Sequence, residues 1–146
     1  AGLVAVNACG NVVDHESHEM LAGIYDKKTQ QVISTKDVLL KQMDQIRKLP
    51  DGNTTIGCIV TNVKLNKAQC TKLAGICHDG YARSIQPVHT MSDGDTIFVL
   101  STNEVEGMVD AVGVLASEVT SMCIKRAILK AESAYGLKAY SDLKNR

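Results

Sequence analysis

The sequence contains no tryptophan, only one phenylalanine, and no excess of charge of either sign. Its 16 lysine and arginine residues balance 16 acidic residues. Nucleic-acid binding proteins depend on an excess of basic side chains, and single-strand binders add aromatic rings on which bases stack. The composition therefore argues against a nucleic-acid partner. No apolar run is long enough to span a bilayer, so we expect no membrane partner either.

The 5 cysteines follow no pattern of metal or redox ligands. Their number is odd, no pair has the Cys-x-x-Cys spacing, and three lie in apolar patterns where a thiol acts as a small hydrophobe. The start of the chain lacks a basic segment before its apolar run, so the sequence shows no secretory signal. We therefore expect a reduced protein of the cytoplasm. The cysteines are Cys9, Cys58, Cys70, Cys77 and Cys123.

Sites for metals and cofactors have little support in the sequence. His15 and His18 have a spacing compatible with a metal pair, but the sequence offers no third ligand. A Cys77–His89 nucleophile pair is no better supported. The glycines do not follow the spacing of a phosphate-binding loop, and Asp93 with Asp95 supplies too few oxygen ligands for a calcium loop. We expect no cofactor.

The length and composition fit one globular domain with a real core. The chain has 146 residues, of which 45% are hydrophobic and 22% charged, and no repeat, low-complexity run or linker divides it. Hydrophobic periodicity and turn residues predict strands alternating with helices, plus extra short strands near the start. This order is typical of a layered α/β or α+β domain. The expected strands cover residues 3–8, 12–13, 54–61 and 96–101.

Capping and breaking residues place the first two helices. A serine or threonine at residues 34–35 caps the first helix, which runs through Ile46 to breaker residues at 49–53. Asn66 caps the second helix, which ends near Ile85. The segments 21–25 and 31–34 fit neither a helix nor a strand clearly, so we leave them unassigned.

The third helix is expected from Glu104 to Ser133, with Gly136 placed to terminate it. This segment is apolar over much of its circumference. An exposed helix usually has one polar face, so the pattern indicates that a partner chain or a missing domain covers part of it.

Two short motifs carry the candidate chemistry. Gly52-Asn53-Thr54-Thr55-Ile56-Gly57 places hydroxyl groups at a turn-to-strand junction, and Asp93-Gly94-Asp95-Thr96 places two carboxylates at another. If the two strands are neighbours, a threonine hydroxyl and a carboxylate pair share one end of a sheet. Carboxylates near a nucleophile can orient it, as the third member of a catalytic triad does. The simpler interpretation is a strand-opening threonine followed by an ordinary aspartate turn.

A threonine hydroxyl is a weak nucleophile unless a base removes its proton. The α-amine of the same threonine can be that base, but only when the residue is the first of its chain. Thr54 can reach that state only if the Asn53–Thr54 bond is cut. Separately, residues 1–6 open directly as a strand without a methionine. Either the chain is cut from something longer, or an initiator methionine has been removed.

Several segments in the same order resemble the L-aminopeptidase/D-esterase family of self-processing hydrolases, which includes β-peptidyl aminopeptidases and the nylon-oligomer hydrolase. The resemblance covers most of the chain. The matching segments are Gly2-Leu3-Val4-Ala5-Val6-Asn7-Ala8, Gly52-Asn53-Thr54-Thr55-Ile56-Gly57, Leu65-Asn66-Lys67-Ala68-Gln69, and Pro87-Val88-His89-Thr90 through Asp93-Gly94-Asp95-Thr96.

The resemblance implies an αββα sandwich similar to that of N-terminal-nucleophile hydrolases, incomplete in this chain. It implies autoproteolysis between Asn53 and Thr54, after which Thr54 is the nucleophile and its freed amine is the base. Asn7 matches the asparagine that helps to hold the oxyanion. Asp93 and Asp95 match the polar pair that surrounds the nucleophile.

The resemblance also implies that the chain is the C-terminal part of a longer protein. Residues 1–53 would be the tail of an α subunit and residues 54–146 the β subunit, together part of one domain in an oligomer of αβ units. The substrate would be a small amide or peptide. Aminopeptidase members have a serine nucleophile and a serine–glutamate pair, so Thr54 with two aspartates is more similar to the nylon-oligomer hydrolase branch. The alternative is an uncleaved, non-catalytic fragment or assembly domain.

Overall fold

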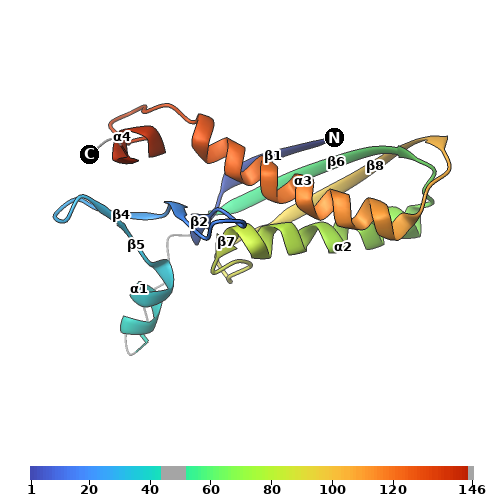
Figure 1. Cartoon of the computed structure of the whole chain (residues 1–146). Helices are drawn as coiled ribbons and strands as arrows, with labels where there is room; N and C mark the ends of the chain where they lie inside the picture. The colour runs from blue at the N-terminus through green and yellow to red at the C-terminus, as the bar shows by residue number, and fades with distance from the viewer. Residues whose placement is uncertain (44–51, 145–146) are drawn as a thin grey trace.

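The computed structural model describes residues 1–43 and 52–144 of the chain. Its main sheet has three strands in the order β1-β6-β8. Strands β1 (Gly2–Asn7) and β6 (Thr54–Val63) are antiparallel, whereas β6 and β8 (Thr96–Val105) are parallel. Parallel strands need a crossover connection, and helix α2 (Lys67–Ser84) supplies it. Mixed helices and strands confirm the α/β (α+β) class that the sequence predicts (Figure 1).

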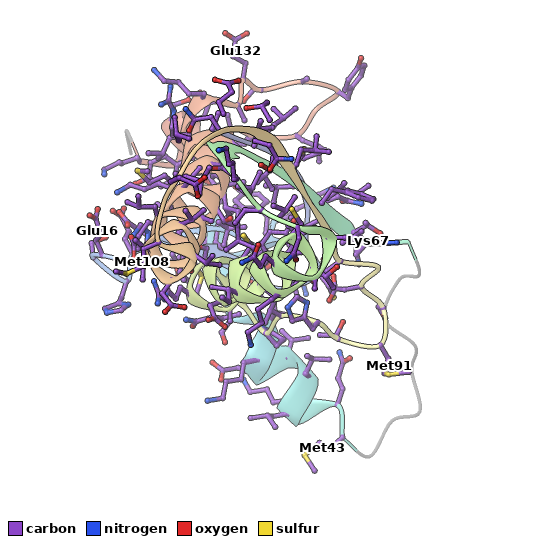
Figure 2. The ribbon with its side chains drawn as sticks, turned by 90° about the vertical axis from the view of Figure 1, so that its right-hand side faces the viewer. Glu16, Met43, Lys67, Met91, Met108 and Glu132 are labelled. Atoms are coloured by element: carbon purple, nitrogen blue, oxygen red, sulfur yellow. The ribbon has the colours of Figure 1, made fainter. Side chains whose placement is uncertain are left out.

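Two long helices, α2 and α3 (Val109–Lys130), lie side by side on one face of the main sheet (Figures 1 and 2). Gly80 allows them to approach closely, because a Cβ atom there would lie 2.6 Å from the backbone oxygen of Ser117. The Ser121 hydroxyl also donates a hydrogen bond to the Gly80 carbonyl at 3.2 Å. The core between helices and sheet comprises Val12, Ile59, Cys77, Tyr81, Ile85, Ile97, Ala116 and Ile124.

The opposite face of the main sheet is apolar and open. Successive strand residues point to opposite faces, and the register places Leu3, Cys58 and Phe98 side by side on the face away from the helices. Leu3 is 75% exposed and Phe98 57% exposed. An apolar patch of this kind usually marks a surface that binds another polypeptide or a ligand. The large exposed side chains of this open face are Leu3, Ile56, Val60, Phe98 and Leu100.

Smaller elements pack beyond the end of the sheet where the candidate residues lie. A second three-stranded sheet has the order β3-β2-β7, and strands β4 and β5 form a separate hairpin (Figure 1). The short helix α1 follows the hairpin, and α4 lies near the C-terminus. The bounds are β2 (Asn11–Val13), β3 (Met20–Ala22), β4 (Ile24–Asp26), β5 (Gln31–Ile33), α1 (Thr35–Lys41), β7 (Ile85–Gln86) and α4 (Tyr140–Lys144).

The helix caps follow the sequence prediction closely. The Asn66 side chain accepts a hydrogen bond from the Gln69 backbone, and the Gln69 side chain accepts one from the Asn66 backbone, which completes a capping box for α2. Ser34 caps α1, because its side chain accepts a hydrogen bond from the Asp37 backbone amide. The helix ends at Lys41, where the Gln42 amide donates to the Leu39 carbonyl oxygen, so the prediction that it continues through residues 42 and 43 is wrong. The predicted stretch from 44 to 51, including Ile46, lies outside the described residues.

The C-terminal third differs from the prediction. Helix α3 begins at Val109 rather than Glu104, because β8 continues to Val105, which pairs with Val63 of β6. The helix ends at Lys130, three residues before the expected end at Ser133. Gly136 instead lies in a turn with a φ of +77°, a conformation that favours glycine. None of the helices within residues 1–43 and 52–144 has the length and apolar character needed to cross a bilayer.

Candidate active site

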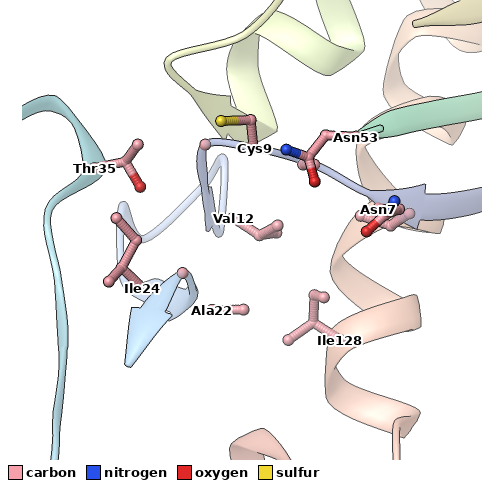
Figure 3. Close-up of a pocket in the computed structure, with 12 residues that line it drawn as sticks. Asn7, Cys9, Val12, Ala22, Ile24, Thr35, Asn53 and Ile128 are labelled. Carbon is pink, nitrogen blue, oxygen red and sulfur yellow. The ribbon is translucent and has the colours of Figure 1, made fainter. Parts of the chain in front are cut away.

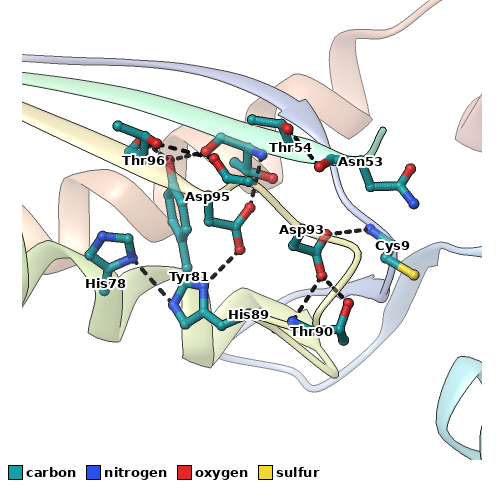
Figure 4. Close-up of polar contacts among 12 residues, drawn as sticks. Cys9, Asn53, Thr54, His78, Tyr81, His89, Thr90, Asp93, Asp95 and Thr96 are labelled. Atoms are coloured by element: carbon teal, nitrogen blue, oxygen red, sulfur yellow. Dashed lines mark hydrogen bonds and ion pairs between the residues drawn. The ribbon is translucent and has the colours of Figure 1, made fainter. Parts of the chain in front are cut away.

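Thr54 and the aspartate pair meet at one end of the main sheet, as their placement before two strands predicts. Strands β6 and β8 are parallel neighbours, so the turns that precede them lie together (Figure 4). A further bridge joins Asn53 to Asp93 just ahead of the two strands. The Gly94 amide donates a hydrogen bond to the Asn53 carbonyl oxygen at 3.0 Å. The two motifs are therefore in direct contact.

The peptide bond between Asn53 and Thr54 is unusual in its polar contacts. The Thr54 hydroxyl donates to the Asn53 carbonyl oxygen at 2.5 Å, so this oxygen accepts two hydrogen bonds when the Gly94 amide is included. The Gly94 amide keeps its proton, so it can stabilise the negative charge that develops on this oxygen when the carbonyl carbon is attacked. The hydroxyl that would attack already contacts the same carbonyl group.

Gly94 also packs against the Thr54 side chain. A Cβ atom at position 94 would lie 2.9 Å from the Thr54 Oγ1, which is closer than real Cβ contacts permit. The absence of a side chain therefore lets the turn approach the hydroxyl. This provides a steric reason for the glycine between the two aspartates.

Asn7 lies at the end of β1, directly opposite Thr54 in the register. Paired residues of antiparallel strands share a face, so both side chains belong to the open face of the sheet. The Asn7 Nδ2 donates to the Gly52 carbonyl oxygen at 3.1 Å. The amide therefore lies beside the Asn53–Thr54 bond, one peptide away from the Asn53 carbonyl.

Asp93 fastens the turn that carries Gly94. Its Oδ2 accepts hydrogen bonds from the Thr90 amide at 3.0 Å and the Thr90 hydroxyl at 2.6 Å. Its Oδ1 accepts one from the Cys9 amide at 3.2 Å. The carboxylate thus joins the turn before β8 to the connection between β1 and β2, and the Thr54 hydroxyl is not among its contacts in the described residues.

Asp95 lies on the helix side of the sheet, beneath the nucleophile candidate. Its Oδ1 accepts a hydrogen bond from the Thr55 amide at 2.9 Å, and its Oδ2 lies 2.7 Å from the His89 Nδ1. Its side chain is only 4% exposed. The carboxylate therefore fixes the backbone of the residue after Thr54, and it is paired with an imidazole that the site prediction omitted.

Two histidines extend this contact toward the surface. The His78 Nδ1 lies 3.2 Å from the His89 Nε2, and the rings meet edge to face (Figure 4). Burial lowers the pKa of His78, and a charge on His89 lowers it further. The sequence places His89 six residues before Asp95, but the pairing with His78 depends on how α2 lies against the turn, which no local pattern indicates.

Tyr81 supports the same strand ends from below. It is completely buried, and its hydroxyl donates to the Thr55 carbonyl oxygen at 3.2 Å, with the Thr96 carbonyl oxygen 3.4 Å away. Burial raises the pKa of Tyr81, so the phenol keeps its proton and acts as a donor. Gly57 makes room for this hydroxyl, because a Cβ atom there would lie 2.8 Å from it.

A cavity of about 580 Å³ adjoins the site (Figure 3). Asn7, Cys9 and Asn53 line its polar end. Burial, followed by the nearby Asp93 charge, raises the pKa of the Cys9 thiol, so the thiol is held in its neutral form. The labelled apolar residues of the cavity are Val12, Ala22, Ile24 and Ile128.

The weaker candidates from the sequence do not assemble into a site. His15 pairs with Glu118 at 3.5 Å, and no group of three or more metal-binding side chains is found among residues 1–43 and 52–144. Cys77 is buried in the hydrophobic core, and burial raises its pKa. It therefore packs as a small hydrophobe.

Comparison with known proteins matches residues 1–141 to the model of peptidase family S58. An uncharacterized aminopeptidase of Mycobacterium leprae is 32% identical over 158 aligned positions, which cover 97% of this chain and 43% of that protein. A second uncharacterized aminopeptidase, from Mycobacterium tuberculosis, is 31% identical and is covered over 46% of its length. The chain thus spans less than half of these relatives.

A shorter match joins the chain to a differently named relative. The 6-aminohexanoate-oligomer endohydrolase of Paenarthrobacter ureafaciens is 33% identical over 108 residues, which cover 71% of this chain and 30% of that protein.

Proposed function

This chain belongs to peptidase family S58, and we propose that it is the C-terminal part of an amide or peptide hydrolase whose nucleophile is Thr54. In this proposal residues 1–53 are the tail of an α subunit and residues 54–146 are the β subunit. The observation that carries the proposal is the double hydrogen bonding of the Asn53 carbonyl oxygen by the Thr54 hydroxyl and the Gly94 amide.

The first step is cleavage of the chain at this bond. The Thr54 Oγ1 attacks the Asn53 carbonyl carbon, and the charge on the carbonyl oxygen is stabilised by the Gly94 amide. Breaking the carbon–nitrogen bond leaves an ester between the Asn53 carbonyl carbon and the Thr54 Oγ1. The Thr54 nitrogen takes up the proton that the hydroxyl loses, and becomes a free amine. Water then hydrolyses the ester, which frees the carboxyl group of Asn53 and both groups of Thr54.

The second step is turnover of substrate. The freed α-amine removes the proton of the Thr54 hydroxyl, which attacks the carbonyl carbon of an amide and forms an acyl-enzyme. The leaving amine receives the proton, and water releases the acyl group. Asn7 lies on the same sheet face as Thr54, so its Nδ2 is the proposed donor to the substrate oxyanion. Asp93 and Asp95 hold the turn and the strand in place.

The open face of the main sheet supports a larger assembly. Leu3 and Phe98 expose large apolar side chains on this face, which favours burial against another polypeptide. The aminopeptidase relatives are more than twice as long as the region they share with this chain. We propose that the missing N-terminal half supplies a second sheet on this face, as in an αββα sandwich. The complete αβ unit would then form an oligomer in the cytoplasm.

The proposed substrate is a small amide or peptide. The relatives include proteins named as aminopeptidases and one named as a 6-aminohexanoate-oligomer endohydrolase, so both aminoacyl amides and linear ω-amino amides are candidates. The cavity beside Asn53 has an apolar lining that suits an aliphatic acyl chain.

An assay on full-length protein tests the proposal. Aminoacyl p-nitroanilides and linear 6-aminohexanoate oligomers are incubated with the wild type and the Thr54→Ala variant, and amine release is measured. We expect hydrolysis of at least one class by the wild type only. Equal activity of the two proteins would overturn the role of Thr54. An uncut wild type without amidase activity would favour a non-catalytic assembly domain.

A further inference from the structure

We propose that His89 is a positioning residue for Asp95, and that the contact between His78 and His89 holds one proton, so that the intact pair carries at most one positive charge and governs how the proposed reaction responds to pH. The inference rests on the proposed function. It concerns two side chains that lie outside the nucleophile, the oxyanion donor and the aspartate pair.

The first support is the geometry around Asp95. One carboxylate oxygen accepts the Thr55 amide at 2.9 Å, and the other lies 2.7 Å from the His89 Nδ1. The Asp95 side chain is 4% exposed, whereas that of His89 is 39% exposed. Both oxygens of a buried carboxylate need hydrogen-bond partners. The His89 ring therefore fixes the orientation of the Asp95 carboxylate, which in turn holds the backbone amide of Thr55, the residue after the nucleophile.

The second support is the backbone of His89. Its φ is +53°, a left-handed conformation that non-glycine residues rarely adopt. Such a conformation persists where the surrounding contacts fix it, and it is found often at functional sites. Here it lies between the cis Gln86–Pro87 bond and the Thr90–Asp93 turn and presents the ring to Asp95.

The shared proton follows from donor and acceptor counting. When both rings are neutral, His78 donates through Nδ1 to the His89 Nε2, and His89 donates through Nδ1 to Asp95. When His89 is an imidazolium, its Nε2 proton donates to the His78 Nδ1 instead, with His78 as the tautomer that carries its proton on Nε2, and the bond to Asp95 is kept. Two protonated rings would place N–H groups against each other at 3.2 Å, so protonation of one ring opposes protonation of the other.

Burial and the charge of the neighbouring ring also oppose a second positive charge on the two histidines. Burial lowers the pKa of His78, and the His89 charge acts in the same direction. Asp95 and Asp79 oppose this shift, and the Tyr81 ring lies 5.3 Å from the His78 ring and 6.1 Å from the His89 ring. Protonation of both rings therefore breaks the hydrogen bond between the histidines and leaves a positive charge on His78, which is half-buried.

The test compares variants in the full-length protein, with the rate of precursor cleavage and kcat/KM measured from pH 5 to pH 8. His89→Ala removes the donor to Asp95, and we expect both rates to fall about tenfold or more, as for loss of a charge-assisted hydrogen bond. His89→Asn keeps an N–H donor near the Nδ1 position, so it should restore most of the rate at neutral pH. It should also flatten the acidic limb of the profile. His18→Asn, outside the cluster, is the control.

Nitrogen-15 NMR of the two imidazoles gives a readout that does not depend on activity. We expect the His89 Nδ1 to carry the proton that faces Asp95, and one proton to lie between the His78 Nδ1 and the His89 Nε2. A His89 Nδ1 without a proton, or wild-type rates and an unchanged pH profile in His89→Ala, would overturn the inference and leave the role of Thr54 intact. An inactive and uncut wild type would instead contradict the proposed function, and the NMR spectra would still decide where these protons lie.

Discussion

The amide nitrogen of Gly94 lies 3.0 Å from the carbonyl oxygen of Asn53, so the turn between the two aspartates contacts the peptide bond that precedes Thr54. The turn belongs to the segment leading into β8, and the peptide bond to the segment leading into β6. The parallel pairing of these strands therefore brings an N–H donor to a carbonyl group 41 positions earlier in the chain. The consequences can be tested residue by residue.

The steric contact of Gly94 predicts that Gly94→Ala slows precursor cleavage. The new methyl group would lie 2.9 Å from the Thr54 Oγ1, so the turn or the hydroxyl must move. We expect a decrease of about tenfold or more, because small displacements of reacting groups are costly. Gly75→Ala is the matched control, since a Cβ atom there meets nothing within 4 Å and α2 should gain stability. Cleavage of Gly94→Ala at the rate of that control would contradict the prediction.

Asn7 should matter more for turnover than for folding. Its side chain is at the open face, and its Nδ2 contacts only the Gly52 carbonyl oxygen within the described chain. For Asn7→Ala in the cleaved full-length protein, we expect kcat to fall by about 10²–10³, the effect of losing an oxyanion donor. Steady-state kinetics measures this change, and Asn62→Ala provides a comparison at an exposed position on the same sheet. A change confined to KM would argue against the oxyanion role.

Tyr81 should contribute to stability through its hydroxyl. Tyr81→Phe leaves the buried carbonyl oxygen of Thr55 without this donor, which should lower the free energy of unfolding by about 1–2 kcal/mol. Urea denaturation of the full-length protein measures the loss. Tyr135→Phe, at a side chain that is fully exposed, should change nothing. Equal stability of the two variants would show that another donor replaces the phenol.

The Asp14–Lys125 ion pair predicts a loss of stability in acid. The Lys125 ammonium lies 2.8 Å from the Asp14 carboxylate, and its hydrogen bond is the main cause that lowers the pKa of Asp14 to about 2. A carboxyl with a lowered pKa stabilises the folded state above its unfolded pKa of about 3.9, and this contribution disappears as the pH falls toward 2. Asp14→Asn should therefore flatten the stability curve between about pH 4 and pH 2. Glu104→Gln, which removes an exposed carboxylate that makes no ion pair in the described residues, is the comparison variant.

The sequence predicts the elements whose signals are local. The asparagine at 66 with glutamine at 69 marks the start of α2, and the β-branched run after Thr54 marks β6. The start of α3 is not predictable in this way, because Glu104 and Val105 fit either a helix or a strand. Long-range pairing of Val105 with Val63 decides in favour of the strand.

The candidate site shows the same division. The neighbouring placement of Thr54 and the aspartates follows from the order of motifs and from the family resemblance, and the structure agrees with it. The His78–His89–Asp95 contacts do not follow, because they arise from the packing of α2 against a turn eleven residues further along the chain. A histidine on a helix has many other uses, so local sequence gave no reason to select it.

The central claim is that the bond between Asn53 and Thr54 is cut by the Thr54 hydroxyl. Intact-mass measurement of purified full-length protein tests it directly, with Thr54→Ala as the control and Thr54→Ser as a variant that keeps the hydroxyl. We predict two fragments for the wild type and Thr54→Ser, with the second beginning at residue 54, and one species for Thr54→Ala. A wild type that hydrolyses amides while remaining a single uncut species, or a cut in Thr54→Ala at the same bond, would contradict the account.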